Sequence, residues 1–152
     1  MPVPIELDLA TRVATAAADV WAVASTMEGV NAELAPLVRM TIPTDAPALT
    51  SAPASFRCWL LAFGVVPFDR HSLVLERVID GGGFDEESTS WMQQRWRHER
   101  RIIDHGDGTC TVTDHLVVVP RIALARAFVA PMVGAVFRHR HKRLALRFGR
   151  VT

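Results

Sequence analysis

Residues 94–119 read QRWRHERRIIDHGDGTCTVTDHLVVV, and this stretch decides the fold. Two runs that alternate in polarity flank the segment GDG at 106–108, which is typical of a three-residue hairpin loop with Gly108 in the left-handed region. A loop of this kind pairs Arg100 with Asp114 across the two strands. The stretch therefore predicts an antiparallel β-hairpin with a defined register.

One face of this hairpin carries polar side chains among apolar ones. Successive side chains of a strand point to opposite faces, so the expected pairs on this face are Trp96–Val118, His98–Leu116, Arg100–Asp114 and Ile102–Val112. The other face holds charged and hydroxyl side chains that suit a wet surface: Arg97, Glu99, Arg101, Thr113 and His115. A register shifted by one residue would bury a mismatched set. We therefore expect the Trp-His-Arg ladder to face the interior.

The whole chain predicts one strand, two short helices, six strands and one long helix, in that order. Alternation and turn residues place the strands at 5–13, 38–43, 55–63, 70–79, 84–92, 94–103 and 109–119. Helices are expected at 16–25, with Thr15 as its N-cap, at 29–36 and at 123–149. Short breaks between the later strands indicate an antiparallel meander.

This order predicts an α+β helix-grip architecture. A seven-stranded antiparallel sheet has to bury one face, and the long C-terminal helix and two short helices are the available cover. Pro131 is expected to kink the long helix or to mark the start of its main segment. A curved sheet around one helix encloses more space than that helix fills, which suits a pocket for an apolar small molecule.

Composition supports a single domain over residues 1–152. The chain is 49% hydrophobic and has a formal net charge of +1. A net charge so close to zero produces no overall positive potential that would attract nucleic acid. No apolar run reaches the roughly 20 residues of a spanning helix, so we expect no integral membrane association and a cytoplasmic location. Cys58 and Cys110 are expected to be reduced and buried.

The chain resembles the START-like superfamily, also called SRPBCC, which includes Bet v 1-type and polyketide cyclase-type helix-grip proteins. The segments that carry the resemblance are FDEES, WRHER, TVTD and VFRHR, together with the element order. The resemblance implies a small bacterial member of unknown ligand. Members of the superfamily bind lipids, hormones or polyketides, and some catalyse cyclisation or dehydration.

Arg100 and Asp114 form the first part of the candidate site. A buried guanidinium needs a carboxylate, so one interpretation is a structural ion pair between two strands. In the other interpretation Arg100 keeps donors for a ligand, because one Asp cannot use all five of its N–H groups. Trp96 and Leu116 would then supply apolar walls.

Glu86 and Ser88 are expected on the inward face of the neighbouring strand if Phe84 points inward. Glu86 would then lie near His98 or Arg100 in a polar cluster, or alternatively at the rim of the sheet. His98 has the side chain of a general acid or base, but a hydrogen-bonded cavity residue is the commoner case. If the protein is an enzyme, His98 and Arg100 are the candidate catalytic residues.

The basic run RHRHKR at 138–143 is expected to be a solvated half of the last helix. His139 and His141 point to different sides of a helix, which is poor metal-ligand geometry. Arg140 is the exception, because its spacing from Phe137 and Leu144 puts it on the inner face. It is expected to reach Glu86, Asp114 or the ligand.

These residues predict a protein that binds a hydrophobic small molecule, such as a lipid, an isoprenoid or an aromatic polyketide. The alternatives are a polyketide cyclase or dehydratase that uses the same cavity, and a non-catalytic interaction module. We expect no cofactor, no metal and no nucleic-acid partner, and a monomer or homodimer. The proposed ligand-binding residues are Trp96, His98, Arg100, Asp114, Glu86, Ser88, Leu116 and Arg140.

Overall fold

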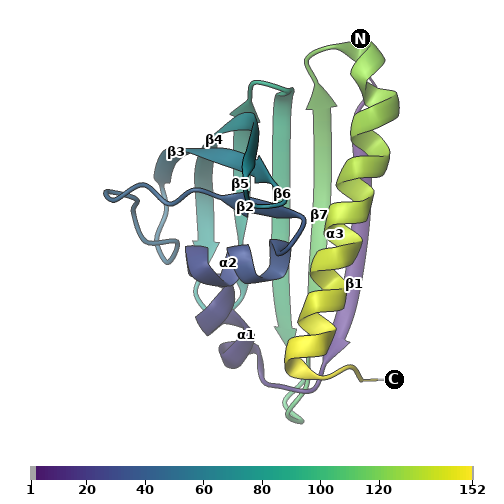
Figure 1. The fold of residues 1–152 in the computed structure, drawn as a ribbon. Helices are drawn as coiled ribbons and strands as arrows, with labels where there is room; N and C mark the ends of the chain where they lie inside the picture. Colours follow the sequence, from purple (N-terminus) through teal and green to yellow (C-terminus); the bar gives the residue numbers. More distant parts are fainter. Residues whose placement is uncertain (1–2, 152) are drawn as a thin grey trace.

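The computed structural model of the protein describes residues 3–151. Seven strands form one antiparallel sheet in the order β1-β7-β6-β5-β4-β3-β2, and the sheet curls around the helices (Figure 1). The strands are β1 (Ile5–Val13), β2 (Val38–Met40), β3 (Ala54–Ala62), β4 (Val66–Ile79), β5 (Gly83–Ser90), β6 (Gln93–Asp104) and β7 (Cys110–Pro120). The helices are α1 (Ala17–Ala24), α2 (Met27–Leu34), a short 3-10 helix η1 (Ala123–Ala125) and α3 (Arg126–Phe148). The predicted α+β helix-grip architecture is confirmed.

The β6–β7 hairpin has the predicted register. Arg100 pairs with Asp114, and the other three expected pairs on this face also occur. Gly108 has a φ of 83°, and the backbone N–H of His105 donates to the Thr109 carbonyl at 3.0 Å. The loop therefore closes as its glycine predicts, and it fixes which side chains face inward.

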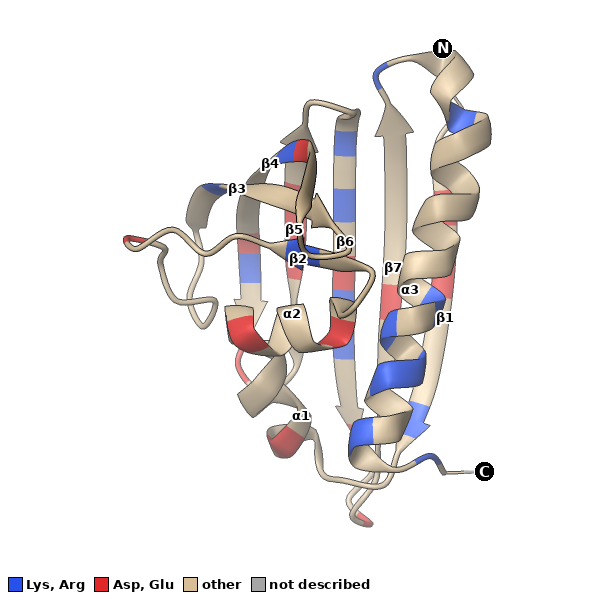
Figure 2. Cartoon of the chain, in the orientation of Figure 1, with Lys and Arg blue, Asp and Glu red and all other residues tan. Residues whose placement is uncertain are grey.

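The polar ladder lies inside the sheet. Arg100 and Asp114 are each 1% exposed and His98 is 2% exposed, while Trp96 is half-buried. Charged residues recur along β6 (Figure 2), and on its outer face Arg97 forms salt bridges with Glu87 and Glu99. The alternation of β6 thus separates a wet surface from a buried polar layer.

Helix α3 crosses the concave face of the sheet beside β7 and β1 (Figure 1). Its apolar side packs as expected, with Val129, Val133 and Phe137 in one core cluster with Leu116. Pro131 lies inside the helix, which runs continuously from Arg126 to Phe148. Pro131 is the sixth residue of this helix, so its missing N–H removes one intrahelical hydrogen bond, and the helix continues past it.

Two local expectations are wrong. Thr15 does not cap α1; its hydroxyl donates to Asp19 at 2.6 Å, and the backbone N–H of Ala17 donates to the Asp104 carboxylate at 2.8 Å. The Asp104 side chain, at the end of β6, therefore caps the helix in place of Thr15. Strand β4 begins at Val66, earlier than predicted, so the apolar segment before residue 70 is largely strand.

The basic run in α3 is also less solvated than expected. Lys and Arg gather on the C-terminal half of the helix (Figure 2), but His141 is only 6% exposed. Its imidazole is hydrogen bonded to Asp114 on β7 and to Thr11 on β1. Because α3 lies directly on these two strands, one side of the basic run faces the buried polar layer.

Cys58 and Cys110 are free and buried, as predicted. Burial and the charge of Glu86 raise the pKa of the Cys58 thiol to about 12, so this thiol is protonated and unreactive. Within residues 3–151, no helix is both long enough and apolar enough to cross a membrane.

Candidate functional site

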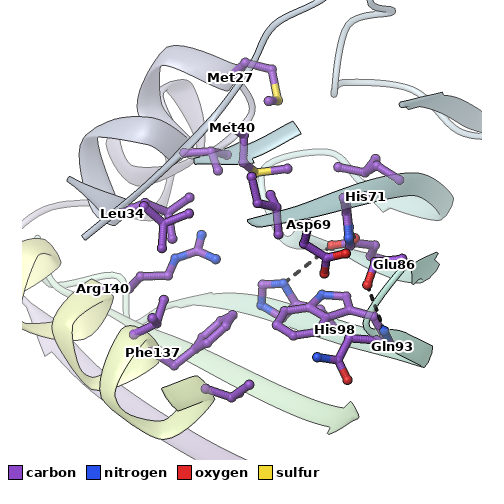
Figure 3. A pocket seen from close by; sticks show the side chains of 18 of the residues that line it. Met27, Leu34, Met40, Asp69, His71, Glu86, Gln93, His98, Phe137 and Arg140 are labelled. Atoms are coloured by element: carbon purple, nitrogen blue, oxygen red, sulfur yellow. Dashed lines mark hydrogen bonds and ion pairs between the residues drawn. The ribbon is translucent and has the colours of Figure 1, made fainter. Parts of the chain in front are cut away.

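A cavity of about 140 Å³ lies between the sheet and helices α2 and α3. Figure 3 shows its side chains converging from the strands on one side and from both helices on the other. Half-buried lining residues from α3 and from the chain between β2 and β3 mark where it approaches the surface. Most of the wall is apolar: Met27, Val30, Leu34, Val38, Met40, Leu49, Leu60, Phe68, Leu73, Leu75, Phe84, Trp96, Met132, Val133, Val136 and Phe137.

Two histidines and a glutamate form the main polar part of this wall. Glu86 is 6% exposed, and its Oε2 lies 2.8 Å from His71 Nε2 and accepts from the Ser88 hydroxyl at 2.6 Å. His98 Nδ1 lies 3.8 Å from Glu86 Oε1. The predicted cluster of Glu86 and His98 is therefore present, and Glu86 does not lie at the rim of the sheet.

Glu86 carries its charge because its neighbours outweigh its burial. Burial alone would raise the pKa of this carboxyl, but the hydrogen bonds and charges of His71 and His98 lower it well below its ordinary value of 4.5. An ionised carboxylate beside two imidazoles inside an apolar cavity can orient a ligand or move a proton.

Arg100 lies behind the cavity wall, between two carboxylates. Its Nε and Nη2 donate to Asp114 at 2.9 and 2.8 Å, and its Nη1 and Nη2 donate to Glu33 at 2.8 Å each. Four of its five N–H groups are thus used, and Arg100 is not among the residues that line the cavity. Asp114 is not the only carboxylate that balances this cation.

Arg100, Asp114 and Glu33 form a buried polar layer in which each group stabilises the charged form of its partners. Burial would lower the pKa of Arg100, but Asp114 and Glu33 raise it well above its ordinary value. Burial would likewise raise the pKa of Asp114, but the charges of Arg100 and His98 hold it well below 3.8. The pKa of Glu33 is also lowered, because Arg100 and Arg140 outweigh its burial. All three groups are therefore charged in the folded protein.

Arg140 connects this layer to the cavity. It is 6% exposed, its Nε donates to Glu33 at 3.1 Å, and its guanidinium lies 4.9 Å from the centre of the Phe137 ring. The prediction that Arg140 lies on the inner face of its helix is confirmed, but the carboxylate that it reaches is Glu33, neither Glu86 nor Asp114.

His98 stands between the cavity cluster and the buried layer. Its Nε2 lies 2.6 Å from Asp114, whose other oxygen lies 2.7 Å from His141. Imidazoles and carboxylates thus alternate from His71 at the cavity, through Glu86, His98 and Asp114, to His141 on α3. Asp114 orients His98 as a carboxylate orients a catalytic histidine, through one ring nitrogen, while the other ring nitrogen faces Glu86.

The expected site residues fall into two groups. Trp96, His98, Glu86 and Arg140 line the cavity, whereas Arg100, Asp114, Ser88 and Leu116 lie behind its wall. Two residues of the second group orient residues of the first, because Asp114 is hydrogen bonded to His98 and Ser88 is hydrogen bonded to Glu86.

Sequence reasoning missed five polar residues of this region, one of which is Gln93 in the cavity wall. His71 and Asp69 alternate with the inward Leu73 and Leu75 of β4, and that spacing could have indicated them. Glu33 could have been sought as the second carboxylate for the donors of Arg100, but its position depends on how α2 docks. His141 was assigned to a solvated face. Within residues 3–151, no group of three or more potential ligands is arranged to hold a metal ion.

Comparisons with known proteins agree with this geometry at the level of the fold. The family model described as Domain of unknown function (DUF8410) matches residues 11–148. No curated protein matches the chain.

Solved structures show the same fold at low sequence identity. A START superfamily protein from Mycobacterium smegmatis is 14% identical, with a TM-score of 0.72 over 94% of this chain and 96% of that one. Zhui aromatase/cyclase from Streptomyces sp. R1128 is 13% identical, with a TM-score of 0.69 over 93% and 92%. Protein CV1439 from Chromobacterium violaceum is 10% identical, with a TM-score of 0.75 over 97% and 99%. The fold is START-like, as the sequence predicted.

Proposed function

We propose that this chain, which belongs to the DUF8410 family, binds a hydrophobic small molecule in the cavity between its sheet and helices α2 and α3. The observation that carries the proposal is the cavity itself, which is apolar over most of its wall and has a small polar cluster on one side. Such a combination buries the body of a ligand and orients its polar end. The START-like fold of a superfamily protein and of an aromatase/cyclase supports the same function.

The size of the cavity restricts the ligand. A space of about 140 Å³ holds roughly one aromatic ring. A lipid or a polycyclic polyketide would need the wall to move. Met27, Met40 and Met132 line the cavity, and methionine side chains adapt to ligands of different shape.

Binding is favoured over a role as an interaction module. A closed core with all polar groups paired would be expected of a module that acts through its surface. Here Gln93 lines the cavity, is 4% exposed, and has a side-chain oxygen that finds no partner among residues 3–151. A buried, unpaired acceptor at a cavity wall is better explained by a ligand that donates to it.

Native mass spectrometry of freshly purified protein is the first test, followed by thermal unfolding with toluene, naphthalene and a medium-chain fatty acid. We expect either a copurified apolar compound or a rise in Tm with at least toluene, because a ligand that binds only the folded state stabilises it. Protein that is free of ligand and unaffected by all three compounds would contradict the proposal.

The cyclase-type enzyme remains a second candidate, because His71 and His98 both line the cavity and both have a carboxylate within 3 Å. Such a pair can remove a proton next to a carbonyl. The test is exchange of the methyl hydrogens of acetophenone in D₂O, followed by NMR. Enzymatic exchange that is lost in His71→Ala or His98→Ala, with binding kept, would support catalysis; no exchange above the buffer rate would contradict it for this ketone.

A further inference from the structure

Building on the proposed function, we propose that the cavity selects ligands that carry a protonated amine on an apolar body of about one ring. Three of the side chains that line it carry a carboxylate or amide oxygen: Asp69, Glu86 and Gln93. In Figure 3 they come from β4, β5 and β6 and lie together on the sheet side of the cavity, with His71 among them. Arg140 lies on the opposite side, toward Leu34 and Phe137.

Asp69 is a buried carboxylate without a cationic partner. It is 3% exposed, and its Oδ1 accepts from the backbone N–H groups of Arg70 and Met92 at 2.9 and 3.1 Å. Within residues 3–151, no Arg, Lys or His side chain forms a salt bridge with it. A buried carboxylate normally has a partner of opposite charge, so this one can receive a cation from outside the chain.

The arginines near the cavity do not neutralise this charge. Arg100 and Arg140 face Glu33 and Asp114, two cations against two carboxylates. Asp69 and Glu86 are left over, and within residues 3–151 the basic side chains next to them are the imidazoles of His71 and His98, both at Glu86. The sheet side of the cavity is therefore negative whenever the imidazoles are neutral. A ligand carboxylate would be repelled there.

Gln93 supplies the observation that points to a ligand independently of charge. Its side chain is almost completely buried, and its side-chain oxygen Oε1 accepts no hydrogen bond within the described part of the chain. An ammonium group has three N–H donors, enough for the amide oxygen and for both carboxylates. Aromatic rings of Trp96 and Phe84 line the same cavity, and aromatic faces attract cations.

A series of four compounds of one size tests the selection: benzylamine, benzyl alcohol, toluene and benzoate, each titrated by calorimetry. We expect benzylamine to bind at least about tenfold more tightly than toluene, because a charge-assisted hydrogen bond contributes about 1.5–3 kcal/mol. Benzyl alcohol should fall between them, and benzoate should bind most weakly.

Substitutions at Asp69 and Gln93 test whether the ammonium group of the ligand binds at these side chains. Asp69→Asn keeps the oxygen that accepts from the backbone, and it should reduce benzylamine affinity about tenfold while leaving toluene unchanged. Gln93→Met should also weaken benzylamine. Asp85→Asn is the matched control, since Asp85 is 8% exposed, is paired with Arg101 at 2.7 Å, and does not line the cavity. It should leave all four affinities as they are.

The outcomes separate this inference from the proposed function. Toluene binding without a preference for benzylamine would overturn the amine selection and leave the cavity as a binding site. Benzoate binding most tightly would also overturn it, and would point to Arg140. If toluene and the other three compounds all fail to bind, the proposed function itself is contradicted for ligands of this size.

Discussion

Arg100 lies between the carboxylates of Asp114 and Glu33, and this arrangement sets the effect of replacing it. Arg100→Met would leave the buried Asp114 without its guanidinium partner and Glu33 with Arg140 alone, which costs about 3–5 kcal/mol. Arg97→Met is the matched control on the outer face of the same strand, where salt bridges contribute about 0–1 kcal/mol. Urea unfolding measures both. Equal losses in the two variants would mean that the Arg100 site is solvated.

Glu86 predicts a pH dependence of stability. Its pKa is lower in the folded protein than its ordinary value of 4.5, so its stabilising contribution is complete above that pH and is lost as the pH falls below it. The free energy of unfolding of the wild type should therefore fall more steeply below about pH 4.5 than that of Glu86→Gln. Urea titrations at several pH values measure the slopes. Glu76→Gln, on the exposed face, should keep the wild-type slope.

The limits of sequence reasoning are clearest at Arg100. Its inward direction followed from strand alternation, and its pairing with Asp114 followed from a loop of three residues. The surplus N–H donors were predicted correctly, but they were assigned to a ligand. The structure gives them to Glu33, which lies 67 residues away on a helix whose docking no local pattern specifies.

At the scale of elements, strand order and most strand boundaries could be predicted because they depend on alternation and on glycine turns, although β4 begins before its predicted start. The helix caps and the contacts between elements could not be predicted in this way. The N-terminus of α1 is capped by Asp104, a residue 87 positions away, while the local candidate Thr15 bonds elsewhere. His141 belongs to a sequence that is basic on all sides, so only the position of α3 on β1 and β7 shows that it is buried.

Gly83 positions β5 against β6, and its replacement tests that contact. A Cβ at Gly83 would lie 1.9 Å from the Arg100 carbonyl oxygen, at a φ of 127°. Gly81 is the matched control, because it also has a positive φ, 72°, but nothing within 4 Å of the added carbon. Gly81→Ala should cost about 1 kcal/mol. Gly83→Ala should cost at least about 2 kcal/mol more.

Thermal or urea unfolding of the two alanine variants gives the comparison. If Gly83→Ala loses no more stability than Gly81→Ala, then β5 does not approach β6 as closely as the structure shows. Because Glu86 pairs with His98 across these same two strands, a larger loss in Gly83→Ala should be accompanied by weaker ligand binding.

At the scale of the whole molecule, the cavity follows from the architecture more than from any single residue. The sheet curls around α3, and α2 closes the remaining side with Leu34 and Met27. A helix-grip order predicts that such a space exists, but its volume depends on how all the lining side chains pack. That is why the sequence indicated a pocket and could not give its size.

Two substitutions that add the same volume test whether the space exists in solution. Leu73 lines the cavity, whereas Leu116 is 0% exposed and lies in the packed core under α3. Leu116→Phe should lose about 1–3 kcal/mol through overpacking. Leu73→Phe should stay within about 1 kcal/mol of the wild type, because its larger ring can enter the cavity. It should also abolish toluene binding. Urea unfolding and calorimetry measure the two effects, and equal destabilisation by both substitutions would mean that the chain has no free space behind Leu73.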